Sequence, residues 1–226
     1  DRKLGGILEI YEKFQGVDPR EVPMKIFPAV HYSMGGLWAG YARNAEGGLT
    51  PAHPDNQMTN VKGLYAMGEC DYQYHGANRL GANSLLSCIF SGLFTAPGIQ
   101  TYMNSLSKSA ADLPSSLFQG AIAKQESRGR DLISSSGGEN PYIIHEQLGD
   151  VMTRCATVVR NNAQLDEAYE KVDELHKRAL ASSLSDTGSW TNQNLIFTKA
   201  LQDMFPVAKS ILKGARMRDE CRGAHF

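Results

Sequence analysis

The chain has 226 residues, with 23 Lys and Arg against 24 Asp and Glu and a formal net charge of −1. This balance offers no basic stripe for nucleic acid, and no apolar run approaches the ~20 residues that span a bilayer. The four cysteines are widely spaced and form no C-x-x-C pair. The composition therefore predicts a reduced compartment, without a metal site or a disulfide framework.

The first 98 residues are typical of short strands and tight turns, because glycine is frequent there. Residues 22–30 are predicted to be extended, since Pro23 and Pro28 exclude a helix interior. Residues 63–68 predict a short buried strand that ends in a glycine turn. Asn83 or Ser84 is then expected to cap a helix that runs to about Phe94 and ends before Pro97.

The second half is typical of helices. Residues 115–133 predict a first helix, and Pro141 suits the first turn of a second. Apolar residues at helical spacing continue through three stretches: 144–159, 165–180 and 195–212. Three or four amphipathic helices with short connections, the last kinked at Pro206, predict an antiparallel bundle.

The segment from His75 to Leu86 reads HGANRLGANSLL and suggests an anion site. Arg79 lies in a glycine-flanked turn just before the predicted helix start, where free N–H groups attract negative charge. A guanidinium fork beside them suits a carboxylate, although on residue type alone a surface salt bridge is equally expected. A P-loop is excluded because Ala82 and Asn83 stand where Lys and Ser or Thr are required, and the chain has no G-x-G-x-x-G.

Two further residues could contribute to such a site. His31 begins the run HYSMGG, in which paired glycines would let the backbone approach a ligand closely. Taken alone, His31 is more often a hydrogen-bonded structural histidine than an anion ligand. Glu69 follows Gly68 at the end of the predicted strand, where it could accept from a ribose-like hydroxyl or simply be solvated.

Together the runs HYSMGG, GLYAMGEC and HGANRLGANSLL resemble the flavoprotein subunit of succinate dehydrogenase and fumarate reductase, and RDECRGAH at 218–225 resembles a motif near its C-terminus. The resemblance covers essentially the whole chain. It implies an α+β fold, in which an incomplete segment of the FAD-binding and capping domains precedes an antiparallel, spectrin-repeat-like helical bundle. The implied divisions are the end of the capping domain (1–25), the C-terminal part of the FAD-binding domain (26–98), a linker (99–112) and the C-terminal helical domain (113–226).

The resemblance also implies roles for individual residues. His31 and Arg79 would bind the dicarboxylate substrate, succinate or fumarate. Glu69 would contact the ribityl or ribose part of FAD, and His75 would serve the turn or pack near the flavin. The flavin ring would lie against the helix start formed by Asn83, Ser84, Leu85 and Leu86.

Other parts of the family pattern are not found in this chain. The FAD-binding β-α-β unit and the arginine that shuttles the proton are expected upstream of Asp1. No catalytic residue is therefore assigned here, and the isolated chain is expected to be inactive and to lack FAD.

The resemblance implies partners and a location as well. Electrons would pass to an iron–sulfur subunit and then to quinone, with membrane anchor subunits involved indirectly, on the cytoplasmic side of the inner membrane. Two alternatives stay open: a soluble flavoenzyme similar to L-aspartate oxidase, and a non-catalytic helical assembly module.

Overall fold

The computed structural model describes residues 3–25, 31–188 and 190–226. The chain divides into two compact units, residues 1–33 and 34–226, each described by itself. The first unit contains α1 (Gly5–Gln15), which ends at Gly16 in the left-handed conformation. The sequence analysis did not predict this helix. Part of the predicted extended segment 22–30 lies outside the described residues.

The expected strands between residues 34 and 82 are not formed. Within the described residues there are only isolated bridges in this region, which pair Leu37 with Asp71, Arg43 with Leu49, and Met58 with Tyr65. The predicted strand at 63–68 is thus reduced to one bridge and a single turn of 3₁₀ helix, η1 (Gly68–Cys70). A strand needs a continuous ladder of partners, and tight turns here interrupt each ladder after one pair.

Helix α2 (Asn83–Ser105) differs from its prediction at both ends. The residue before it, Ala82, is left-handed, and no side chain caps the helix, so the expected cap by Asn83 or Ser84 is wrong. The helix also continues through Pro97 and Gly98 instead of ending before them. The buried Gly98 explains the continuation, since a Cβ there would lie 3.3 Å from the carbonyl carbon of His53.

Helix α3 (Ser115–Ser134) agrees closely with the predicted 115–133. Only Gly129 and Leu132 are buried along it, so α3 shares little of its surface with the rest of the chain. Its main attachment to α6 is Arg128, whose Nη2 donates to the Lys199 carbonyl at 2.9 Å. The same guanidinium pairs with Asp203 at 2.9 Å.

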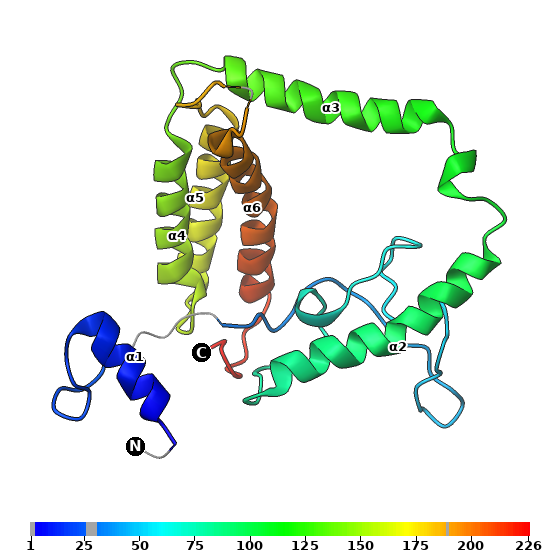
Figure 1. The fold of residues 1–226 in the computed structure, drawn as a ribbon, viewed down its shortest axis with the longest axis horizontal. Helices are drawn as coiled ribbons and strands as arrows, with labels where there is room; N and C mark the ends of the chain where they lie inside the picture. Colours follow the sequence, from blue (N-terminus) through cyan, green and yellow to red (C-terminus); the bar gives the residue numbers. More distant parts are fainter. Residues whose placement is uncertain (1–2, 26–30, 189) are drawn as a thin grey trace. The chain divides into compact units, whose positions relative to one another are not determined.

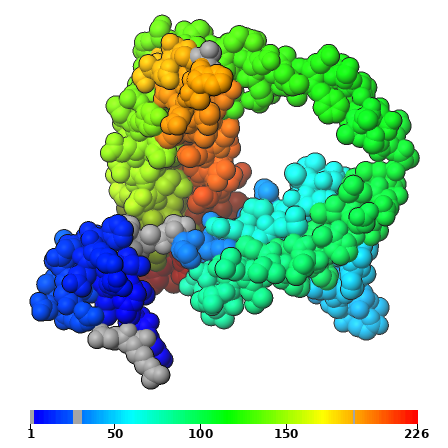
Figure 2. All heavy atoms as spheres, in the orientation of Figure 1, coloured from blue at the N-terminus to red at the C-terminus, as the bar shows by residue number. Residues whose placement is uncertain are grey.

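Helices α4 (Pro141–Ala156), α5 (Asn162–Leu180) and α6 (Gln193–Arg216) confirm the predicted helical second half. Pro141 occupies the first turn as expected, and Pro206 lies inside α6. Asn140, Asn161 and Asn192 cap the three helices with their side chains. The helices lie side by side (Figure 1), and their atoms form one continuous mass (Figure 2). One hydrophobic core, drawn from these three helices alone, holds them together.

Candidate functional site

The segment that leads to Arg79 is anchored by a buried carboxylate. Asp71 is almost fully buried, and its side chain accepts from the Gln73 backbone N–H at 2.8 Å and from the Gln57 amide. Gln57 is also fully buried and adopts a left-handed backbone with φ 60°. A buried polar network that satisfies its members rigidifies its surroundings, so this cluster fixes the start of the turn. The sequence analysis missed these residues.

Two tyrosines extend the anchor. The hydroxyls of Tyr41 and Tyr74 lie 2.6 Å apart, and the Gln57 amide also reaches Tyr74. Burial raises the pKa of both tyrosines above the ordinary value. Both phenols therefore stay protonated and act as neutral hydrogen-bonding groups. Tyr41 also packs edge-on against Phe94 of α2 at 5.5 Å, which ties the network to that helix.

His75 is held by the first turn of α2. Its Nε2 lies 3.2 Å from the hydroxyl oxygen of Ser87, and that hydroxyl donates to the Ser84 carbonyl at 2.7 Å. Because the Ser87 proton is used in this way, Nε2–H of His75 is the donor to the Ser87 oxygen. His75 thus joins the turn to the helix, which fits the expected turn role.

Arg79 lies half-buried between that turn and the start of α2. Its backbone N–H donates to the Asn78 side chain at 2.9 Å, and Nη1 donates to the Leu80 carbonyl at 3.1 Å. The side chain therefore bends back along its own turn. A guanidinium carries five donors in a planar fork, a geometry that is chemically suited to a carboxylate.

The N-terminus of α2 follows directly. Asn83 and Ser84 are half-buried, while Leu85 and Leu86 expose 72% and 63% of their surface. The left-handed Ala82 starts the helix without a side-chain cap. The first N–H groups of a helix have no partner within it, so this end suits a ligand that carries acceptor atoms.

The structure brings Glu69 to the same helix. Glu69 is exposed on η1, which packs on α2. The adjoining Gly68 has φ 73°, and a Cβ there would lie 3.1 Å from the Cys88 sulfur. Glycine is required at this position both by the backbone angle and by the close packing. Glu69 and the start of α2 are therefore held on one piece of structure.

His31 is exposed and belongs to the first compact unit, whereas Arg79 belongs to the second. Of the paired glycines after His31, Gly36 has a close neighbour within the chain, whereas a Cβ added at Gly35 would meet none of the described residues within 4 Å. Gly36 packs against the backbone of Cys70, because a Cβ added at Gly36 would lie 2.7 Å from the Cys70 carbonyl carbon. The Leu37 N–H also donates to the Cys70 carbonyl at 2.7 Å.

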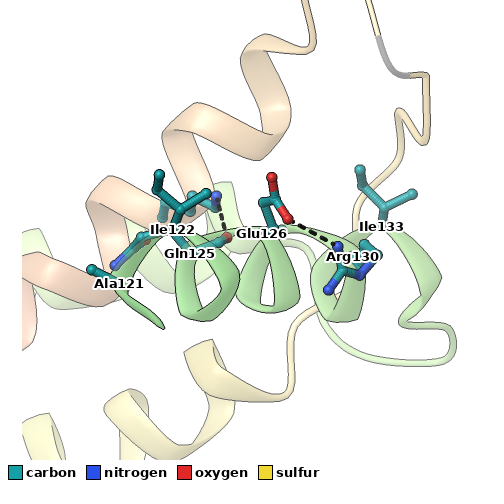
Figure 3. A pocket seen from close by; sticks show the side chains of 8 residues that line it. Ala121, Ile122, Gln125, Glu126, Arg130 and Ile133 are labelled. Atoms are coloured by element: carbon teal, nitrogen blue, oxygen red, sulfur yellow. Dashed lines mark hydrogen bonds and ion pairs between the residues drawn. The ribbon is translucent and has the colours of Figure 1, made fainter. Parts of the chain in front are cut away.

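A groove lies elsewhere on the chain. It has a volume of about 620 Å³ and lies along α3, with Lys199 of α6 at its edge. Figure 3 shows Ile122, Gln125 and Arg130 lining it, and none of the predicted site residues takes part. No group of His, Cys, Asp or Glu within the described ranges is arranged to hold a metal. Among the same residues, no helix combines the length and apolar character that crossing a membrane requires.

Comparison with known proteins identifies the class. A family model described as an FAD binding domain matches residues 1–85, and one described as fumarate reductase flavoprotein C-term matches residues 145–226. The candidate site at 69–86 thus lies at the end of the first match, and the α4–α6 bundle falls within the second except for the first four residues of α4. These matches define a flavoprotein segment, with part of an FAD-binding domain followed by a helical domain.

Individual relatives agree. The succinate dehydrogenase flavoprotein subunit of Bacillus subtilis is 49% identical over 226 residues, which is all of this chain and 36% of that protein. The fumarate reductase flavoprotein subunit of Escherichia coli is 32% identical over 224 residues, covering 99% of this chain and 34% of the relative. Among solved structures, the E. coli quinol fumarate reductase superposes with a TM-score of 0.79 at 30% identity, over 97% of this chain and 34% of that one.

The chain belongs to the family of succinate dehydrogenase and fumarate reductase flavoprotein subunits. The resemblance that the sequence motifs indicated is confirmed. The chain spans about a third of the length of the curated relatives it matches.

Proposed function

We propose that this chain carries the substrate-contacting and flavin-contacting part of an FAD-dependent oxidoreductase that interconverts succinate and fumarate. One observation carries the proposal above the others. Arg79 lies directly before the uncapped start of α2, within a chain that is 49% identical to a succinate dehydrogenase flavoprotein subunit.

In this proposal Arg79 holds one carboxylate of the substrate. Its guanidinium matches a carboxylate with two parallel hydrogen bonds, and His31 supplies a further donor to the dianion. Pinning one end of the substrate places its C–C bond for reaction and lowers the entropic barrier. The buried network at Gln57, Asp71 and Tyr74 keeps the Arg79 turn from shifting.

The residues around α2 fit FAD. The N–H groups of Ser84, Leu85 and Leu86 lie in the first turn of α2, which has no side-chain cap. The positive end of this helix favours negative charge on a reduced flavin. Glu69, on the 3₁₀ turn packed beside α2, accepts from a ribityl or ribose hydroxyl. When bound, FAD supplies the acceptor for the hydride that leaves the substrate carbon.

Electrons then pass to an iron–sulfur subunit and to quinone, with the flavoprotein held peripherally on the cytoplasmic side of the membrane. The solved structures that resemble this chain support the assignment of partners, because they include a quinol fumarate reductase with menaquinol molecules. No residue of this chain is assigned the proton shuttle.

The test uses a hybrid in which this chain replaces the matching segment of the B. subtilis subunit. Succinate oxidation is measured with an artificial acceptor, alongside FAD content. Arg79→Ala should lower kcat/KM for succinate about 10²–10⁴-fold, since a desolvated charged pair of this kind is worth roughly 3–5 kcal/mol. FAD content should stay unchanged.

The matched control is Arg130→Ala, which removes an exposed arginine paired with Glu126 on α3. It should change kcat/KM by less than about twofold. Equal effects of the two substitutions would contradict the assignment of Arg79. Turnover of L-aspartate in place of succinate would instead indicate the related oxidase activity.

A further inference from the structure

The end of the chain returns to the turn that carries Arg79. Gly223 has φ 60°, and a Cβ at this position would lie 2.6 Å from the carbonyl carbon of Ala77 and 2.9 Å from its Cβ. No real side chain tolerates such distances. The backbone at Gly223 therefore presses directly on the backbone of the turn, two residues before Arg79.

The segment around Gly223 is itself rigidly folded. Arg222 and His225 exchange both backbone hydrogen bonds, at 2.9 and 3.1 Å, which closes a tight turn with Gly223 at its tip. His225 is almost fully buried beneath this turn. Its Nε2 lies 3.0 Å from the Arg218 carbonyl, and its Nδ1 lies 3.0 Å from Nη1 of Arg160.

These contacts fix the state of the imidazole. A guanidinium only donates, so Nδ1 of His225 accepts from Arg160, and Nε2–H donates to the Arg218 carbonyl. The ring is therefore neutral, and both of its nitrogens are used. It links the tip of the turn to the helical bundle through one side chain.

Arg160 completes the anchor. Its Nε and Nη2 donate to the carbonyls of Thr157 and Ala156 at the end of α4, at 2.9 and 3.0 Å. Its backbone N–H donates to the Phe226 carbonyl at 2.8 Å, and Phe226 N–H donates to Val158 at 3.1 Å. The last residues of the chain are thus fastened to the end of α4 from both sides.

We propose that residues 218–226 act as a clamp that positions Arg79, with Gly223 as the contact on the turn and His225 with Arg160 as the anchor on the bundle. This inference rests on the proposed function, because positioning matters only if Arg79 binds the substrate. The buried network at Asp71 holds one end of the turn, and the clamp holds its middle. A displacement of about 1 Å at such a group can cost on the order of a hundredfold in rate.

Gly223→Ala tests the contact, and Gly137→Ala is its matched control. Gly137 also has a positive φ, of 78°, but a Cβ added there would have no atom of the described residues within 4 Å. Both substitutions therefore carry the same kind of backbone strain, while only the first pushes on the turn. The two variants are compared in the hybrid enzyme and in the 226-residue chain.

In the hybrid enzyme, Gly223→Ala should lower kcat/KM for succinate at least about tenfold, mainly through KM, with the same FAD content as Gly137→Ala. In the chain itself, amide hydrogen exchange at residues 76–80 should become faster only in Gly223→Ala. An unchanged exchange rate, or an unchanged kcat/KM, would overturn the clamp. If the unsubstituted hybrid does not oxidise succinate, the proposed function fails, and the exchange comparison still tests the contact.

A second pair of variants tests the clamp independently, in case Gly223→Ala does not fold. His225→Gln keeps one acceptor and one donor, whereas His225→Ala keeps neither. The glutamine variant should retain kcat/KM for succinate within about threefold, and the alanine variant should lose at least about tenfold, again through KM. Equal losses in both variants would mean that the hydrogen bonds of His225 do not position Arg79.

Discussion

The core of the α4–α6 bundle allows a sharp prediction of stability. Leu175 is fully buried at the centre of the cluster that the three helices share. Leu175→Ala removes three carbons from a site enclosed on every side, and such substitutions cost about 2–5 kcal/mol from lost transfer energy and the remaining cavity. Leu180→Ala is the control, because Leu180 ends the same helix with 58% of its surface exposed.

The free energy of unfolding is measured by urea titration with far-UV circular dichroism, and Tm by a thermal scan. A loss of about 3 kcal/mol in a chain of this size corresponds to a fall in Tm of roughly 6–12 °C. Leu180→Ala should cost less than about 1 kcal/mol. If both variants unfold at the same urea concentration and the same temperature, the assignment of the core to α4–α6 is refuted.

Three further predictions concern charge, capping and the cofactor. Hydrogen bonds from Lys177 and Lys209 lower the pKa of Asp173 to about 2 from 3.8, so its stabilising effect is full above pH 4 and disappears as the pH falls towards 2. The difference in urea midpoint between Asp173→Asn and the parent should shrink over that range, whereas Asp150→Asn, on the exposed side of α4, should show no such trend. Asn161→Ala, which removes the acceptor for the Ala163 and Gln164 N–H groups, should lower the free energy of unfolding by about 1 kcal/mol in the same titration; no change would mean that water replaces the cap. Finally, the 226-residue chain purified alone should show no flavin absorbance, because it lacks a glycine fingerprint for the pyrophosphate; retained FAD after gel filtration would contradict this.

The helices of the second half could be predicted because their signals are local. The apolar spacing of 165–180 and the Pro141 start depend on neighbours within one or two turns, and α4 and α5 begin and end close to the predicted residues. The same reasoning failed at Pro97, because the helix continues where Gly98 makes room for His53. That contact joins residues far apart in the sequence, and no local pattern reveals it.

The candidate site likewise contains parts with a local sequence signal and parts that depend on distant residues. Arg79 and the start of α2 were predicted together because they are consecutive. The Asp71 anchor was missed, since Gln57 and Tyr74 reach it from distant turns and Gln57 adopts a backbone angle unusual for its type. The strands expected before residue 82 depend entirely on pairing partners, which sequence patterns do not supply.

The contact between Gly223 and Ala77 also has a consequence for the order of folding. Roughly 150 residues separate the two, so closing this loop costs about 4 kcal/mol of chain entropy. The bundle, built from neighbouring helices, forms without that cost and should fold early. The turn that carries Arg79 would then reach its final shape only after residues 218–226 have docked, which makes the proposed substrate site one of the last features to mature.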